Sequence, residues 1–181
     1  MAFEWTTLIA TGSGAVIALT GTLLNDHLRD RRETRRGRQT RARDLYVEFI
    51  VAAGICHTRL RRLAQNPGSR PDLDTATRDA LVEAGIHEIR ERLFIDASEN
   101  VAAAGQTLYE RLRDLRRAVA GGASWSSRDF HDVYHPYLDA AWAYRAAVRK
   151  ELGSVPFAPS VFGWVTLNGT ATCPVCLSIA T

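Results

Sequence analysis

The chain has 181 residues, enough for one domain with an added segment, and a formal net charge of +3. Its three cysteines are too few for the disulfide framework of a small secreted protein. The basicity is local, because residues 26–44 hold eight arginines and four acids, a net of +4, and the remaining 15 basic and 16 acidic residues nearly cancel. These numbers exclude a disulfide-stabilised scaffold and a uniformly basic domain.

Residues 1–25 are predicted to form a membrane anchor. The segment from Trp5 to Asn25, WTTLIATGSGAVIALTGTLLN, has 21 residues and no charge. About 20 mainly apolar helical residues cross a hydrocarbon core of roughly 30 Å. A cleaved signal peptide is disfavoured because the residues before this segment, Met-Ala-Phe-Glu, are acidic where a signal is basic. The alternatives are a helix that packs inside a soluble bundle and a helix that lies in the membrane interface.

The arginine-rich residues 26–44 follow the span directly and are predicted to form a juxtamembrane helix. Because only this end is basic, the positive-inside rule places the N-terminus outside and the bulk of the chain in the cytoplasm, as in a single-pass protein of the cell membrane. Nucleic acid is not an expected partner, since no aromatic residue is interleaved and Asp30 and Glu33 interrupt the run. The residues expected to contact lipid headgroups are Arg29, Arg31, Arg32, Arg35 and Arg36.

Small residues line one face of the predicted span. Ala10, Gly14 and Ala18 recur at every fourth position, and Gly21 follows Gly14 by one heptad. Such a face lets two membrane helices approach closely, although small residues are also common in membrane helices generally. We therefore expect helix packing here, with a homo-oligomer as one outcome.

Residues 45–152 are predicted to form a helical bundle in the cytoplasm. A helix over 38–64 is expected to end at Asn66–Pro71, and another is expected over 75–94, capped by Asp72 or Asp74, although Arg92–Asp96 could instead be extended. Apolar residues recur at intervals of three and four in both. In the first they are Leu45, Phe49, Ala52, Cys56, Leu60 and Leu63, and in the second Leu81, Ile86, Ile89 and Leu93.

Two further helices complete the bundle. Asp96 and Glu99 have the spacing of a capping box, and the helix behind them is expected to stop at Gly121-Gly122. Its apolar positions are Val101, Leu108, Leu112, Leu115 and Val119. The last helix is expected to start near Ser126 or Asp129 and to end at Gly153, with Pro136 either kinking it or beginning its main part. The fold class is therefore all-α, an antiparallel bundle of about four helices.

Aromatic residues concentrate in the last of these helices, where Phe130, Tyr134, Tyr137, Trp142 and Tyr144 give more aromatic surface than one buried stripe needs. The simpler interpretation is that they fill the core. The alternative is a groove for a partner or ligand.

Residues 153–181 form an uncharged tail of 29 residues with three prolines, which argue against a helix. We expect an irregular end that is disordered or loosely packed. A hairpin around Asn168-Gly169 is the main alternative, although Pro174 would confine its second strand to an edge.

The tail ends in a lone C-x-x-C pair, Cys173 and Cys176. A redox function would need a βαβ context, which is missing from the pattern. A zinc site would need two more ligands, and His131 and His135 could present two imidazoles from one helical turn. Against this, the order is reversed from that of a zinc finger, 37 residues separate His135 from Cys173, and Pro136 could break the helix. We therefore predict no cofactor and keep this metal site as an alternative.

No phosphate-binding loop, nucleophile elbow, H-E-x-x-H motif or dinucleotide-binding motif occurs in the chain. His57 and His87 fall on polar or boundary positions and are predicted to be solvated. This pattern favours a binding role over catalysis.

The order of features resembles a group of small actinobacterial membrane-anchored proteins of unknown function. The resemblance spans residues 5–153 and rests on the span, the arginine run leading into RDLYVEFIVAA, and a final helix ending AYRAAVRKELG. It implies the same anchored helical architecture and no specific activity. The predicted function is therefore that of a membrane-anchored helical interaction protein, which binds itself or an unknown protein partner. The alternatives are a small metal- or ligand-binding domain that uses the tail cysteines, and a soluble bundle.

Overall fold

The computed structural model describes residues 37, 39–69 and 72–178. The chain divides into two units, Met1–Arg41 and Ala42–Thr181, and the second holds nearly all of the described residues. The predicted span and the small-residue face lie outside the described part. Within that part no strand occurs and no helix is both long and apolar enough to cross a membrane. The all-α fold class is confirmed.

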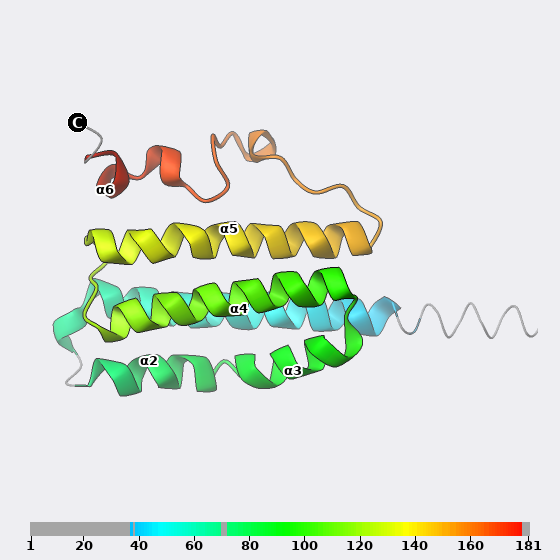
Figure 1. Cartoon of the computed structure of the whole chain (residues 1–181), viewed down its shortest axis with the longest axis horizontal. Helices are drawn as coiled ribbons and strands as arrows, with labels where there is room; N and C mark the ends of the chain where they lie inside the picture. Colours follow the sequence, from blue (N-terminus) through cyan, green and yellow to red (C-terminus); the bar gives the residue numbers. More distant parts are fainter. Residues whose placement is uncertain (1–36, 38, 70–71, 179–181) are drawn as a thin grey trace, which may run out of the picture. The chain divides into compact units, whose positions relative to one another are not determined.

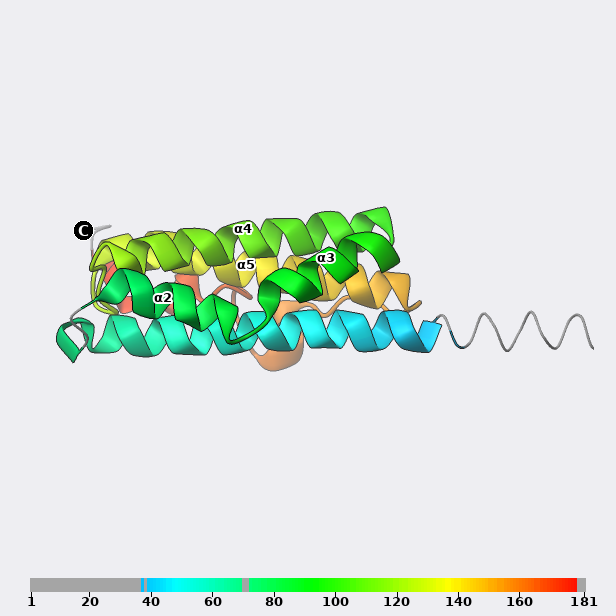
Figure 2. The ribbon, with the colours of Figure 1, turned by 90° about the horizontal axis from the view of Figure 1, so that it is seen from below.

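Four rows of helix form the bundle. The first is a helix over residues 39–65, one residue from the predicted range. A 3-10 turn η1 (Pro67–Ser69) follows, then α2 (Leu73–Val82), α3 (Ile86–Asp96), α4 (Glu99–Ala120) and α5 (Arg128–Glu151). The rows alternate in direction, and α2 and α3 together make one row (Figures 1 and 2). Short loops between neighbours give the up-and-down order expected of such a bundle.

The core is built from the apolar faces that the sequence spacing predicts. Phe49, Cys56 and Leu60 on helix 39–65 have no exposed surface. The five predicted apolar positions of α4 are also buried, as are Phe130, Tyr137 and Tyr144 of α5. Each fully buried large apolar side chain contributes about 1.5–3 kcal/mol to folding. Core filling is therefore confirmed for these three aromatic residues.

Two buried tyrosines on α5 join it to helix 39–65. The hydroxyl of Tyr144 donates to the carbonyl of Tyr46 at 3.1 Å, and that of Tyr137 donates to the carbonyl of Ala53 at 3.3 Å. Burial raises the pKa of both hydroxyls, so both remain protonated donors. These hydrogen bonds satisfy polar groups that would otherwise be costly in the core.

The predicted helix over 75–94 is wrong in one respect, because it is two helices. α2 ends at Val82 and α3 starts at Ile86, with Gly85 between them at φ 63°. Glycine adopts this left-handed conformation without a steric penalty. The prediction failed because the apolar spacing of Leu81, Ile86 and Ile89 continues across the break. The segment Arg92–Asp96, for which an extended form was the alternative, is helical.

The predicted capping box at the start of α4 is also wrong. Asp96 is the last residue of α3, and the N-cap of α4 is Ser98, whose side chain makes no capping hydrogen bond. The predicted end is confirmed, because α4 stops at Ala120 before the two glycines.

α5 starts one residue from the expected position and continues through Pro136. Ser127 is its N-cap, and the Ser127 hydroxyl accepts a hydrogen bond from the backbone N–H of Phe130 at 3.3 Å. Proline inside a helix removes one backbone hydrogen bond at a cost of about 3 kcal/mol, which packing on both sides of α5 offsets here. The predicted late start at Pro136 is wrong, because one helix runs through this residue and keeps His131 and His135 on the same face.

His57 is packed against aromatic rings, so the prediction that it is solvated is wrong. Its ring stacks on Tyr134 and Tyr137 with centroid distances of 5.5 and 4.9 Å. Burial, helped by the charge of Arg61, lowers the pKa of His57 to about 4. The other histidine, His87, is exposed, and its Nδ1 lies 2.8 Å from the Tyr109 hydroxyl.

This pKa shift predicts acid sensitivity. The ordinary histidine pKa is about 6.5, so between pH 6.5 and 4 the unfolded chain binds a proton at His57 that the folded chain excludes. Stability should fall as the pH drops through this window, by up to about 1.4 kcal/mol per pH unit. In urea unfolding with chelator present, His57→Phe should show a shallower pH dependence than the natural chain. Parallel curves would contradict the assignment.

The tail is irregular, as predicted, with three short helical turns. These are η2 (Pro159–Phe162), η3 (Thr170–Thr172) and α6 (Pro174–Leu177). The alternative of a hairpin is wrong, because Asn168-Gly169 leads into η3 and Pro174 begins α6. The tail runs along α5 (Figure 1). Aromatic packing joins the two, since Trp142 of α5 lies 5.6 Å from Phe162 and 6.0 Å from Trp164 between ring centroids.

Candidate metal centre

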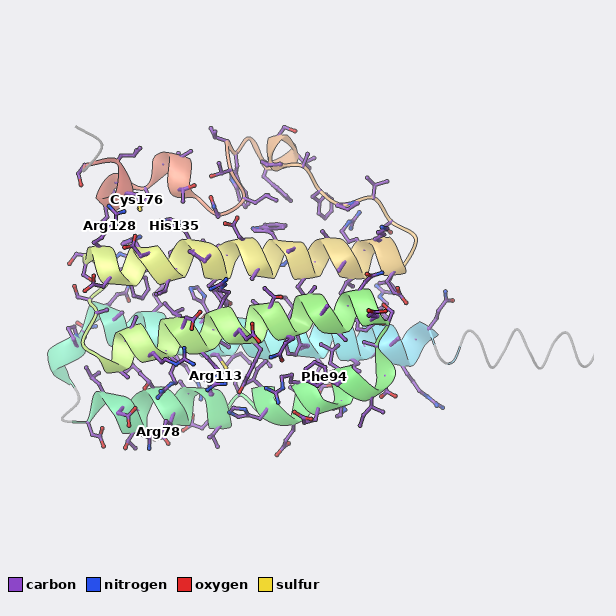
Figure 3. All side chains as sticks on the ribbon, in the orientation of Figure 1. Arg78, Phe94, Arg113, Arg128, His135 and Cys176 are labelled. Atoms are coloured by element: carbon purple, nitrogen blue, oxygen red, sulfur yellow. The ribbon has the colours of Figure 1, made fainter. Side chains whose placement is uncertain are left out.

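The structure brings together the four residues of the alternative metal site. One potential ligand atom each from His131, His135, Cys173 and Cys176 lies within 4.8 Å of the other three. Figure 3 places His135 and Cys176 where α6 approaches α5, beside Arg128. The first three residues are buried and Cys176 is half-buried. Residues separated by the whole tail in sequence therefore form one cluster.

His131 has one nitrogen committed to the backbone and the other aimed into the cluster. Its Nε2 lies 2.9 Å from the carbonyl oxygen of Trp125. Because a carbonyl only accepts hydrogen bonds, Nε2 carries the proton of the neutral ring. The lone pair is then on Nδ1, which lies 3.4 Å from the sulfur of Cys173.

His135 is oriented in the same way through its opposite nitrogen. Its Nδ1 donates to the carbonyl oxygen of Asn168 at 2.7 Å. The remaining nitrogen, Nε2, is buried and has no hydrogen-bond partner among the described residues. A metal-binding histidine usually donates its second N–H to a carbonyl or carboxylate, which fixes the tautomer and the ring orientation. Both imidazoles meet this condition.

The cysteine pair lies on a tight turn that favours thiolate at Cys173. Cys173 is the N-cap of α6, with Pro174 at the first helical position. Burial opposes ionisation of the Cys173 thiol, but hydrogen bonds from the backbone N–H groups of Cys176 and Val175 and from the Cys176 side chain outweigh it and lower the pKa of Cys173. The pKa of Cys176 is raised, by burial first and then by the adjacent Cys173. Cys173 therefore loses its proton more readily than an ordinary cysteine, and Cys176 less readily.

These distances suit a small tetrahedral ion. Zinc bonds of about 2.0–2.1 Å to nitrogen and 2.3 Å to sulfur imply ligand-to-ligand separations of about 3.3–3.8 Å. The 3.4 Å between Cys173 and His131 already falls in this range, and the others lie within 4.8 Å. Small side-chain rotations would complete the coordination.

Hydrogen bonds around Asn168 hold the tail in position for the cysteines. Its side-chain amide donates to the carboxylate of Asp139 on α5 at 2.8 Å. Its side-chain oxygen accepts from the backbone N–H of Thr170 at 3.0 Å and from the Thr170 hydroxyl at 2.7 Å. From the sequence, Asn168 was predicted only as part of a turn, and its role as a partner of His135 was not foreseen. The contact between His131 and the carbonyl of Trp125 was not foreseen either, since backbone contacts of this kind leave no residue signature.

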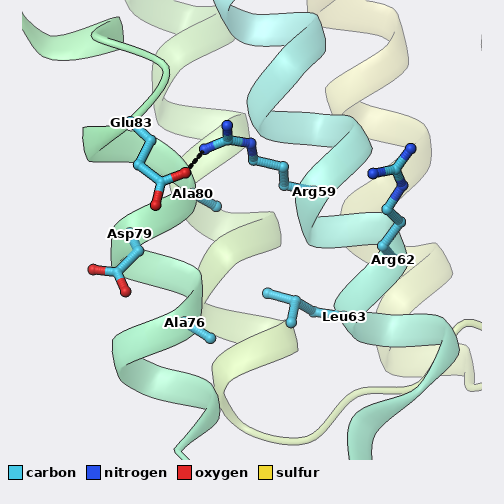
Figure 4. Close-up of a pocket in the computed structure, with 7 residues that line it drawn as sticks. All are labelled: Arg59, Arg62, Leu63, Ala76, Asp79, Ala80 and Glu83. Atoms are coloured by element: carbon cyan, nitrogen blue, oxygen red, sulfur yellow. Dashed lines mark hydrogen bonds and ion pairs between the residues drawn. The ribbon is translucent and has the colours of Figure 1, made fainter. Parts of the chain in front are cut away.

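A second polar site is a surface hollow of about 310 Å³ between helix 39–65 and α2. Figure 4 shows Arg59 paired with Glu83 across it, with Arg62 and Asp79 nearby and Leu63 and Ala76 below. The charges of Arg59 and Glu83 cancel each other, and no nucleophile or histidine lines the hollow. It has the composition of a solvated helix interface.

The other predicted site residues lie outside the described part of the chain. These are the lipid-contacting arginines Arg29, Arg31, Arg32, Arg35 and Arg36, and the helix-packing residues Ala10, Gly14, Ala18 and Gly21. Their roles stay predictions.

No family model, curated protein or solved structure matches the chain. The assignment of a function therefore depends on its own residues.

Proposed function

We propose that the chain is a non-catalytic helical binding protein whose uncharged tail is fixed to its bundle by a structural zinc site. The observation that supports this best is the convergence of His131, His135, Cys173 and Cys176, each imidazole with its second nitrogen donating to a backbone carbonyl. Four protein ligands fill a tetrahedral ion, which is the composition of structural zinc sites; catalytic sites keep one position open for water. The zinc therefore stabilises the fold and performs no reaction.

The composition of the cluster favours zinc over other biological cations. Calcium and magnesium prefer oxygen ligands, and the cluster offers two sulfurs and two nitrogens. A mixed sulfur and imidazole set with tetrahedral geometry is typical of zinc. Zinc would also stabilise both thiolates at once, offsetting the burial and the neighbouring Cys173 that raise the pKa of Cys176.

We further propose that residues 5–25 anchor this domain in the cell membrane with the bundle in the cytoplasm. The support is the uncharged segment of 21 residues and the arginine run after it. In this proposal the bundle acts by binding itself or a partner protein at the membrane surface.

Zinc content of the purified full chain tests the metal proposal. The natural chain should hold about one zinc ion per chain, because one four-ligand site is present in its described part. Cys173→Ser and His135→Ala should each lose most of this zinc, since three ligands hold the ion far more weakly. Cys56→Ala, which removes a cysteine buried in the core, should retain it. Equal zinc content in all four proteins would contradict the proposal.

A further inference from the structure

A second hollow of the bundle has no role in the proposed zinc site. It has a volume of about 310 Å³ and lies between helix 39–65, α5 and the start of the tail. The surface that faces the hollow is apolar, although two arginines and two tyrosines are among the lining residues. The six apolar side chains that form its walls are Val47, Ile50, Trp142, Val148, Phe157 and Phe162. We call this hollow the aromatic groove.

The aromatic groove is open and already formed. Val47 is 51% exposed, Phe157 42% and Phe162 38%, so large apolar side chains face solvent at its mouth. Small-molecule sites are typically concave, mainly apolar and about 300–1,000 Å³ in volume. The aromatic groove is at the lower end of this range, which suits one alkyl chain.

Two arginines give the aromatic groove a positive charge. The guanidinium of Arg145 lies 4.7 Å from the centre of the Trp142 ring, and that of Arg149 lies 3.8 Å from the centre of the Phe157 ring. Both residues line the hollow. Neither has a carboxylate within ion-pair distance in the part of the chain that the structure describes. Other arginines of the bundle, such as Arg92 and Arg116, are paired with acids.

We propose that the aromatic groove binds a single-chain lipid with an anionic head group. The alkyl chain would lie against the apolar walls, and the head group would accept hydrogen bonds from Arg145 and Arg149. Nε of Arg149 already donates to the carbonyl oxygen of Val155 at 2.7 Å, so this residue would bind the head group through its two terminal nitrogens. A guanidinium that keeps its stack on an aromatic ring still presents such N–H donors at its edge, the arrangement in which arginine binds carboxylate or phosphate. The occupant is a lipid and not an acidic peptide, because the surface facing the hollow is apolar and, apart from the two arginine side chains, offers a peptide backbone nothing to pair with.

Photolabelling of the full chain tests this assignment. The protein is purified in a maltoside detergent, whose uncharged head group leaves the charge of the probe to decide binding. The probe is hexadecanoic acid with a diazirine in its chain, compared with a hexadecyl trimethylammonium probe that carries the same group. The acid should label the tryptic peptides of residues 44–59 and 151–181, which hold two walls of the aromatic groove. The cationic probe should label them about tenfold less, because it lacks a charge-assisted hydrogen bond to an arginine and one such bond changes affinity about tenfold.

Two variants and a matched control complete the test. Arg145→Gln/Arg149→Gln should reduce labelling by the acid about tenfold, and Val47→Trp, at an exposed position of the wall, should block it. Arg90→Gln/Arg113→Gln removes two arginines that also stack on an aromatic ring, that of Tyr109, and should leave labelling unchanged. Three results would overturn the proposal. They are equal labelling by the two probes, labelling by the acid that is spread over peptides of α2 and α3, and labelling by the acid that neither variant reduces.

Discussion

Removal of zinc should free the tail from α5 while the bundle remains folded. At free zinc about a thousandfold above the dissociation constant, the ion stabilises the tail-bound form by about 4 kcal/mol, a factor of about a thousand. The amides of Cys173, Leu177 and Ser178 are hydrogen-bonded within the clustered segment. In hydrogen exchange followed by mass spectrometry, peptides covering residues 165–178 should therefore exchange about a thousandfold faster after chelation.

An internal reference and a matched variant make this experiment decisive. The amides of α4 lie in the core and should keep their protection, because the aromatic and aliphatic packing of the bundle does not involve the metal. Cys173→Ser should exchange like the chelated natural chain with or without added zinc. Cys56→Ala should respond to zinc as the natural chain does. Unchanged exchange of the tail on chelation would mean that packing alone holds it.

The full chain should remain in the membrane pellet after alkaline extraction, and two arginines in the predicted span should release it. An arginine near the centre of a membrane helix costs about 2.5–3.5 kcal/mol, so Ile17→Arg/Leu19→Arg should cost about 5–7 kcal/mol and abolish insertion. The measurement is the fraction of protein in the pellet after ultracentrifugation.

A control variant places two arginines on the surface of the bundle and not in the predicted span. Val51 and Val82 are 53% and 67% exposed on the bundle, so Val51→Arg/Val82→Arg should stay in the pellet. If the natural chain is found in the supernatant, the membrane anchor is wrong, and the zinc site would remain a separate question because its ligands lie in residues 131–176.

The helices could be predicted where apolar residues recur at helical spacing and a clear stop signal follows them. Leu108, Leu112 and Leu115 define α4, the two glycines after Ala120 end it, and the structure agrees. The break at Gly85 was missed because apolar spacing carried across it, although glycine before an isoleucine was the available signal. The capping box at Asp96 failed because a neighbouring helix already used that residue.

The metal site could be predicted only in part. An i, i+4 pair of histidines on a helix and a C-x-x-C pair name four ligands, but nothing in their spacing says that the tail returns to the start of α5. That return depends on Trp142 packing against the tail and on Asn168 bonding both Asp139 and His135, which are tertiary contacts. Pro136 argued against a continuous helix, and packing overrode its local preference.

X-ray absorption at the zinc edge of the purified full chain tests the central claim most directly, because it reports the atoms bound to the ion. The arrangement of His131, His135, Cys173 and Cys176 predicts two sulfurs at about 2.3 Å and two nitrogens at about 2.0 Å. Cys173→Ser should lose one sulfur from this shell or lose the ion altogether. A zinc shell of oxygen and nitrogen alone, unchanged in Cys173→Ser, would contradict the proposed site.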